Sequence, residues 1–143
     1  MKTIYLVLSL FLTTNSYSQG LIFIENTEKE ILEGMKHVND YEFVENVINY
    51  SKAEKTLKYR NSEKTGNYTT SFVTFYIDLK TDKCGHMIIT YDIDELPTTL
   101  KAFNNTDKYI KIGNLHYVDV EGKYEYNIYT NEAALGIVIY PLK

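Results

Sequence analysis

The stretch Val73-Thr74-Phe75-Tyr76-Ile77-Asp78-Leu79-Lys80-Thr81-Asp82-Lys83-Cys84-Gly85-His86-Met87-Ile88-Ile89 decides the fold, because apolar and polar residues alternate on both sides of a polar turn. A period of two is typical of β-strands that bury one face. Asp82 and Gly85 are the first and fourth residues of an Asp-x-x-Gly sequence, which favours a type I turn followed by a left-handed glycine. The stretch therefore predicts an antiparallel hairpin with its tip at residues 82–85.

This turn also predicts the register of the hairpin, because it places Asp82 opposite His86. The apolar face would then carry the pairs Leu79–Ile89, Ile77–Tyr91 and Phe75–Ile93. The more polar face would carry the pairs Lys80–Ile88, Asp78–Thr90 and Tyr76–Asp92. A slip of one residue would mix the two sets, so the pattern supports this pairing.

Two helices are predicted before the hairpin. Thr27 and Glu30 have the spacing of a capping box, and apolar residues at helical spacing follow from Ile31. A second helix is predicted to begin at Asp40, with a strand as the alternative, because Val, Ile and Tyr also favour sheets. Strands are predicted at residues 55–61 and 68–80.

The chain after the hairpin predicts one short helix and further strands. Pro97 suits the first turn of a helix that would end near Asn104. Strands are then predicted at residues 109–120, 123–130 and 135–141. The Asp119–Gly122 turn leaves two registers open, one of which pairs Tyr117 with Tyr126. The predicted fold is α+β: two N-terminal helices followed by a five- or six-stranded, mostly antiparallel sheet with one short inserted helix.

Residues 1–18 have the layout of a secretory signal peptide. Lys2 is followed by an apolar run over residues 4–12, and Ser16 and Ser18 fit a cleavage site before Gln19. The run is too short to span a bilayer, which needs about 20 apolar residues. We expect residues 19–143 to form a single globular domain, exported to a bacterial periplasm or the exterior, with no transmembrane segment.

Composition excludes several classes of function. The chain has 143 residues, a formal net charge of -4 and no basic run, which argues against nucleic acid as a partner. Its single cysteine excludes a disulfide framework within the chain and a Cys-rich zinc module. No cofactor is expected, since no P-loop, dinucleotide-binding or nucleophile-elbow motif is present, and no metal site is expected either.

Two groups of residues could carry chemistry. The predicted turn makes Cys84 an exposed thiol, which could link two chains in a dimer. Cys84 with His86 would form a nucleophile–base pair only inside a cleft, which a hairpin tip does not offer. Asp92, Asp94 and Glu95 form an acidic cluster at a strand end and could divide acid and base roles in a hydrolase.

Tyrosine is unusually frequent in this chain, with 14 residues. The candidate binding residues lie in predicted strands and are Tyr76, Tyr117, Tyr124, Tyr126 and Tyr129. Tyrosine packs well in sheets, but it is also enriched at recognition surfaces. We expect an exported, non-catalytic binding domain of the bacterial cell envelope, such as an inhibitor or immunity-type protein, whose partner is a protein or a glycan. The alternatives are a small secreted hydrolase and a structural component of the envelope.

Overall fold

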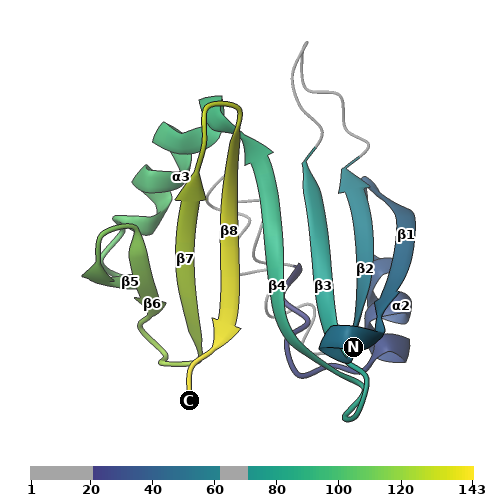
Figure 1. Ribbon diagram of the computed structural model, residues 1–143. Coiled ribbons are helices and arrows are strands. Elements are labelled where there is room, and N and C mark those ends of the chain that lie inside the picture. The colour runs from purple at the N-terminus through teal and green to yellow at the C-terminus, as the bar shows by residue number, and fades with distance from the viewer. Residues whose placement is uncertain (1–20, 62–70) are drawn as a thin grey trace.

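The computed structural model describes residues 21–61 and 71–143, which form one eight-stranded antiparallel sheet (Figure 1). Its strands are β1 (Tyr41–Asn49), β2 (Glu54–Asn61), β3 (Phe72–Asp78), β4 (Lys83–Asp92), β5 (Tyr109–Gly113), β6 (His116–Asp119), β7 (Tyr124–Thr130) and β8 (Ala134–Pro141). The helices are α2 (Glu28–Met35) and α3 (Leu96–Phe103), with short 3-10 turns η2 (Tyr50–Lys52) and η3 (Ile93–Glu95).

The strand order β1-β2-β3-β4-β8-β7-β6-β5 describes two four-stranded meanders that meet at β4 and β8. The first meander runs from β1 to β4. The chain then passes through η3 and α3 to the far edge, and returns strand by strand from β5 to β8. The pairing of β4 with β8 therefore joins segments about 50 residues apart in the chain, as in Met87 opposite Ile139.

One face of the sheet, which we call the covered face, carries the hydrophobic core. The α2 and α3 helices lie on this side, behind the sheet in the view of Figure 1. Residues of α2, of the segment before it and of α3 pack against alternate strand residues, among them Ile31, Phe23, Phe103, Phe75, Met87 and Ile137. An ion pair of 2.5 Å between Lys55 Nζ and Glu28 Oε1 also ties α2 to β2.

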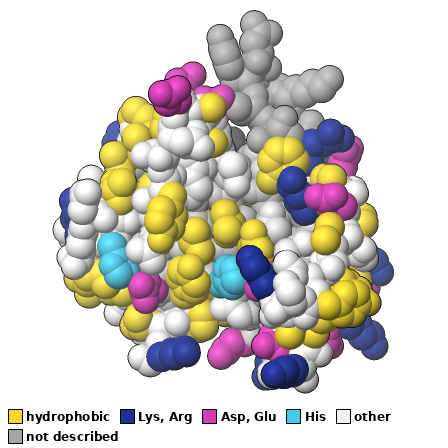
Figure 2. All heavy atoms as spheres, in the orientation of Figure 1, with side chains coloured by type: hydrophobic (Ala, Val, Ile, Leu, Met, Phe, Trp, Pro, Cys, Tyr) yellow, Lys and Arg dark blue, Asp and Glu magenta, His cyan; other side chains and the backbone are white. Residues whose placement is uncertain are grey.

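The opposite side of the sheet, which we call the open face, is covered by neither α2 nor α3 (Figure 1). Its side chains are the alternate residues of each strand, for example Thr74, Tyr76, Ile88, Val138 and Tyr140. Figure 2 shows this side, with apolar side chains and one histidine near its middle and a second histidine toward the left of the view. These side chains therefore lie on the side of the sheet that α2 and α3 leave uncovered.

The predicted second helix is wrong, and with it the predicted fold class. Residues from Tyr41 to Asn49 form the edge strand β1, and most of its residues are exposed. A helix in this segment would need a surface on which to bury its apolar stripe, whereas β2 offers hydrogen bonds and two opposite charges, Lys58 and Arg60, for pairing. The described part of the chain is mostly β, and its sheet has eight strands in place of the predicted five or six.

The predicted strand at 109–120 is also divided. Leu115 has a left-handed φ of 54° and turns the chain between β5 and β6. The register left open after it is resolved, since Tyr117 lies opposite Tyr126. The inserted helix after Pro97 is confirmed as α3. The Thr27–Glu30 capping box is present as well, with Glu30 N donating to Thr27 Oγ1 at 3.3 Å.

The β3–β4 hairpin has the predicted faces but another register. Its turn lies at residues 79–82, where Asp78 Oδ1 accepts from the backbone N–H groups of Lys80 and Thr81 at 2.7 and 2.9 Å. The turn closed by Asp78 forms in place of the predicted Asp82–Gly85 turn, which requires a left-handed conformation at Gly85. Gly85 is instead the unpaired residue of a β-bulge, so Tyr76 faces His86 and not Asp92.

Candidate functional site

Three aromatic rings on neighbouring strands form a row across the open face, which we call the aromatic ladder. It consists of Tyr76 on β3, His86 on β4 and Tyr140 on β8. The ring centroids of Tyr76 and His86 are 4.3 Å apart with planes at 11°, and those of His86 and Tyr140 are 5.5 Å apart at 24°. The β3–β4 and β4–β8 registers place all three side chains in one row.

The stacking geometry determines which parts of the three rings another molecule could contact. Neighbouring strands lie about 4.8 Å apart, and the rings of the ladder face one another across that spacing. Their flat sides are therefore largely occupied by each other, and their edges are turned away from the sheet. Those edges carry the tyrosine hydroxyls and the imidazole nitrogens, which can donate and accept hydrogen bonds.

The ladder is uncharged near neutral pH. Burial between the two tyrosines lowers the pKa of His86, although the nearby Glu54 carboxylate partly opposes that shift. Burial also raises the pKa of the Tyr76 and Tyr140 hydroxyls. A neutral imidazole between two neutral phenols offers polar groups to a partner without a net charge to desolvate.

The rows beside the ladder are also uncharged at the centre of the face. Thr74, Ile88 and Val138 lie side by side on β3, β4 and β8, and Val138 is buried although it faces away from the core cluster. The Glu54 carboxylate on β2 lies close enough to the ladder to affect the pKa of Tyr76 and His86. Other charged side chains lie further out, and several are matched in pairs. These pairs are Arg60–Glu42 at 3.1 Å, Lys58–Glu45 at 3.9 Å and His116–Glu125 at 2.6 Å. An uncharged centre within a polar rim is the usual anatomy of a protein interface.

The five tyrosines predicted as binding residues do not share one surface. Tyr76 belongs to the ladder, and Tyr129, 59% exposed, lies on the open face of β7. Tyr117 and Tyr126 are 1% and 3% exposed, and their rings pack in the core near Phe103. Tyr124 packs partly buried against the same core. Tyr76 and Tyr129 are therefore the members of the set placed for contact with a partner.

Two ladder residues, His86 and Tyr140, are not among the predicted binding residues. The predicted register places Asp92 opposite Tyr76, so it indicates no aromatic neighbour there. The sequence signal that could have found the stack is the Asp78 turn, since a hairpin closed at residues 79–82 puts His86 opposite Tyr76. The contact to Tyr140 depends on the β4–β8 pairing, which no local pattern indicates.

The prediction of an exposed thiol is wrong. Cys84 is 1% exposed and belongs to the core cluster. Burial raises the pKa of its thiol to about 12, and its Sγ donates to the carbonyl oxygen of His86 at 3.2 Å. The side chains of Cys84 and His86 lie on opposite faces of β4, so they form no nucleophile–base pair. A second chain could reach this sulfur only if the hairpin opened.

The acidic cluster serves local structure. Asp92 is the N-cap of η3, and its Oδ1 accepts from the backbone N–H of Asp94 at 3.0 Å. Asp94 and Glu95 are exposed in that turn, at the entrance to α3. Across residues 21–61 and 71–143, no group of three or more His, Cys, Asp or Glu side chains is placed to hold a metal ion.

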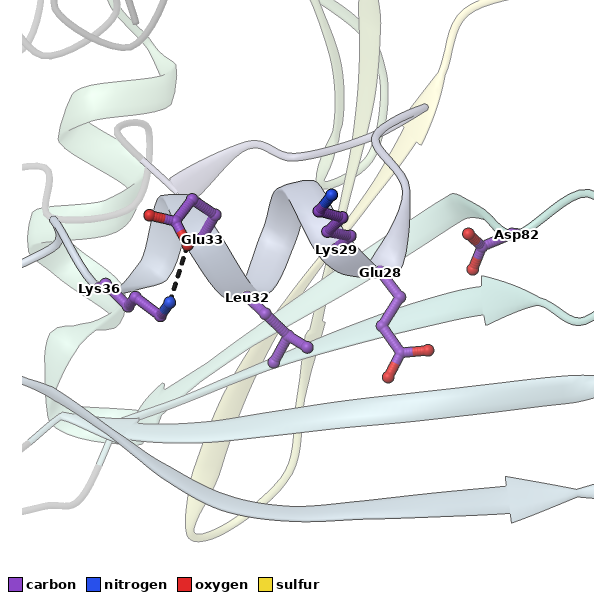
Figure 3. A pocket seen from close by; sticks show the side chains of 6 residues that line it. All are labelled: Glu28, Lys29, Leu32, Glu33, Lys36 and Asp82. Atoms are coloured by element: carbon purple, nitrogen blue, oxygen red, sulfur yellow. Dashed lines mark hydrogen bonds and ion pairs between the residues drawn. The ribbon is translucent and has the colours of Figure 1, made fainter.

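A hollow of about 440 Å³ lies between α2 and the tip of the β3–β4 hairpin (Figure 3). It is lined by Glu28, Lys29, Leu32, Glu33, Lys36 and Asp82. Glu33 and Lys36 pair with each other at 2.7 Å at its rim, and both are well exposed. Side chains of both charge signs, open to water and without a nucleophile or a histidine, do not make this hollow a catalytic site.

The fold and the site together define a mostly-β protein with an uncovered aromatic sheet face. No family model, curated protein or solved structure matches this chain. Within the part of the chain that the structure describes, no helix has the length and apolar character needed to cross a membrane.

Proposed function

We propose that this protein is an exported, non-catalytic binding domain of the bacterial cell envelope, and that it binds another protein through its open face. The observation that carries the proposal is the aromatic ladder near the centre of the sheet face that neither α2 nor α3 covers. Tyrosine supplies rigid contact area with a polar tip, and few rotamers are lost when it is covered.

The ladder geometry favours a protein over a glycan as the partner. Sugar rings pack against the flat sides of aromatic rings, and in the ladder both sides of His86 and one side each of Tyr76 and Tyr140 face neighbouring rings. Ring edges with hydroxyl and imidazole groups suit a partner that presents backbone and side-chain hydrogen-bonding groups. The matched ion pairs around the centre, such as Glu42–Arg60, suit a broad contact with a polar rim.

The location of the protein is part of this proposal. The signal peptide predicted from Lys2, the apolar run and Ser18 lies outside the described residues. An exported domain of this size that caps a partner's surface would act as an inhibitor or immunity-type protein. The hydrolase alternative receives no support from the geometry, because neither Cys84 with His86 nor the Asp92 cluster forms an assembled site.

The proposal is tested by capture from a cell-envelope extract with two charge-introducing variants. Tyr140→Glu places a carboxylate on the open face, whereas Leu32→Glu makes a comparable change on α2, on the opposite side of the sheet. Both side chains are partly exposed, so both variants should fold, as thermal unfolding followed by circular dichroism would check.

We expect the wild-type protein and Leu32→Glu to retain the same envelope protein, and Tyr140→Glu to lose it at least tenfold, since a buried unpaired charge in an interface costs several kcal/mol. Equal capture by all three proteins, or loss with Leu32→Glu alone, would show that the open face is not the binding surface.

A further inference from the structure

The edge strand β1 exposes several large apolar side chains. Four of its side chains are between 43% and 51% exposed, namely Phe43, Val44, Val47 and Ile48. Tyr50 in the adjoining turn is 82% exposed. The strand is nine residues long, and among the described residues no strand neighbours its outer side. Such an edge is a template for pairing with another strand.

The usual protection of an edge by net charge is absent from β1. Its two carboxylates, Glu42 and Glu45, are each paired with a cation on β2, Arg60 and Lys58 respectively. A second copy of the same edge would therefore meet a surface with little net charge, although the chain as a whole is acidic. Because the charges of β1 are already paired, this edge suits a second copy of itself better than a strongly charged partner.

We infer that β1 pairs with β1 of a second copy of this chain, antiparallel and about a two-fold axis, so that the two sheets become continuous. The bulge at Val44 leaves Glu45–Asn49 as a regular stretch for this contact. An axis at Val47 sets that residue against its own copy and places Glu45 opposite Asn49, so no two carboxylates face each other.

The apolar area at this edge is sufficient for such a dimer. The exposed fractions of Phe43, Val44, Val47, Ile48 and Tyr50 correspond to roughly 600 Å² per copy, given the usual size of these residues. Two copies would cover at most roughly 1,200 Å² with these side chains, which reaches the lower end of specific interfaces. The opposite edge, β5, is shorter at five residues and carries a register irregularity between Lys111 and Gly113, although Ile110 and Ile112 are exposed there.

The first test measures the mass of the full chain in solution by light scattering across micromolar concentrations. We expect a dimer for the wild-type protein and a monomer for the double variant Val47→Lys/Ile48→Lys, whose lysines would repel across the axis. The matched control on the other edge, Ile110→Lys/Ile112→Lys, should remain a dimer.

Two outcomes of this measurement would overturn the inference. One is a wild-type protein that remains monomeric at about 100 µM, a concentration at which even a weak specific dimer with a Kd of about 10 µM would be mostly assembled. The other is a dimer that is lost only in the β5 variant.

A second test uses engineered cysteines, since Cys84 is buried and does not compete. Asn46→Cys, Val47→Cys and Ile48→Cys are introduced one at a time, with Ile112→Cys as the control on β5. At least one β1 variant should form a disulfide-linked dimer at least tenfold faster than the control. No difference between the edges would contradict β1 pairing. The Tyr140→Glu variant should stay dimeric, which separates this inference from the proposed function.

Discussion

The bulge at Gly85 decides where two neighbouring side chains point. In a regular strand, residues two apart share a face, so Cys84 and His86 would lie on the same side. The extra residue in β4 sends Cys84 into the core and His86 to the open face, where it stacks on Tyr76. A single unpaired residue thus separates a structural thiol from a surface imidazole and builds the centre of the proposed site.

Two positions with left-handed backbone provide a matched pair of stability measurements. Ala53 has φ 50° and caps η2, whereas Gly122 has φ 68° in the β6–β7 turn, where an added Cβ would meet nothing within 4 Å. A side chain in this conformation costs about 1 kcal/mol. We expect Ala53→Gly to raise the free energy of unfolding by about 1 kcal/mol and Gly122→Ala to lower it by about 1 kcal/mol. Urea unfolding measures both, and changes of the same sign would contradict this explanation by backbone strain.

The imidazole of His86 should make stability depend on pH. Burial lowers its pKa in the folded protein, so the unfolded chain takes up this proton at a higher pH. Its contribution is therefore complete above about pH 6.5 and is lost as the pH falls through that value toward the folded pKa. The carboxylates whose pKa is lowered, such as Glu33 and Asp78, act in a more acidic range.

We expect His86→Phe, which keeps a ring in the stack, to remove most of the pH dependence of urea unfolding between about pH 7 and 5. The control His37→Phe alters an exposed histidine on the other side of the sheet and should retain that dependence. An unchanged slope in His86→Phe would show that this imidazole is not the responsible group.

Among the elements, α2 depends on one close contact with the segment before it. Gly34 faces Phe23, whose ring is buried and packs edge-on against Phe75 at 5.7 Å. A Cβ at position 34 would lie 2.7 Å from Phe23 Cζ and closer still to Cε1. Alanine is the better helix former by about 1 kcal/mol, but overpacking a fixed core costs about 1–3 kcal/mol.

We therefore expect Gly34→Ala to lower the free energy of unfolding by about 1 kcal/mol, although alanine has the higher helix propensity. Gly85→Ala is the control, because a Cβ there meets nothing within 4 Å, and it should change stability by less than about 0.5 kcal/mol. A stabilised Gly34→Ala variant in urea unfolding would mean that Phe23 moves freely.

The elements differ in how far local sequence determines them. The capping box at Thr27 and Pro97 at the start of α3 are local signals, and they suffice to predict both helices. The alternation around Phe75 predicts the correct faces of β3 and β4, because alternate residues of a strand point to the same face. The predicted hairpin register is wrong because the turn closed by Asp78 forms in place of the Asp82–Gly85 turn. The strand β1 is predicted as a helix because its residues suit either structure, and only the pairing with β2 selects the strand.

At the scale of the whole molecule, the β4–β8 contact turns two meanders into one sheet. It brings His86 beside Tyr140 and sets Ile88 against Val138, and neither contact follows from the neighbouring sequence. The aromatic ladder is thus a product of topology, which explains why the sequence predicts a tyrosine-based surface that includes Tyr76 but does not predict the stacking of Tyr76 with His86 and Tyr140. Helices α2 and α3 lie on the other side and leave this sheet face uncovered, and we propose that a partner covers it.

The central claim is that the open face is the surface a partner covers. The most direct measurement is tyrosine nitration, quantified by mass spectrometry, of the protein in buffer and in an envelope extract. Tyr129 and Tyr140 are exposed on the open face, whereas Tyr50, in the turn after β1, lies outside it and is the internal reference. Because Tyr50 belongs to the proposed β1 dimer contact, both samples contain the protein at the same concentration, so that the extent of dimer formation is equal. We expect the extract to protect Tyr129 and Tyr140 several-fold and to leave Tyr50 as reactive as in buffer. Protection of Tyr50 alone, with Tyr129 and Tyr140 unchanged, would contradict the claim.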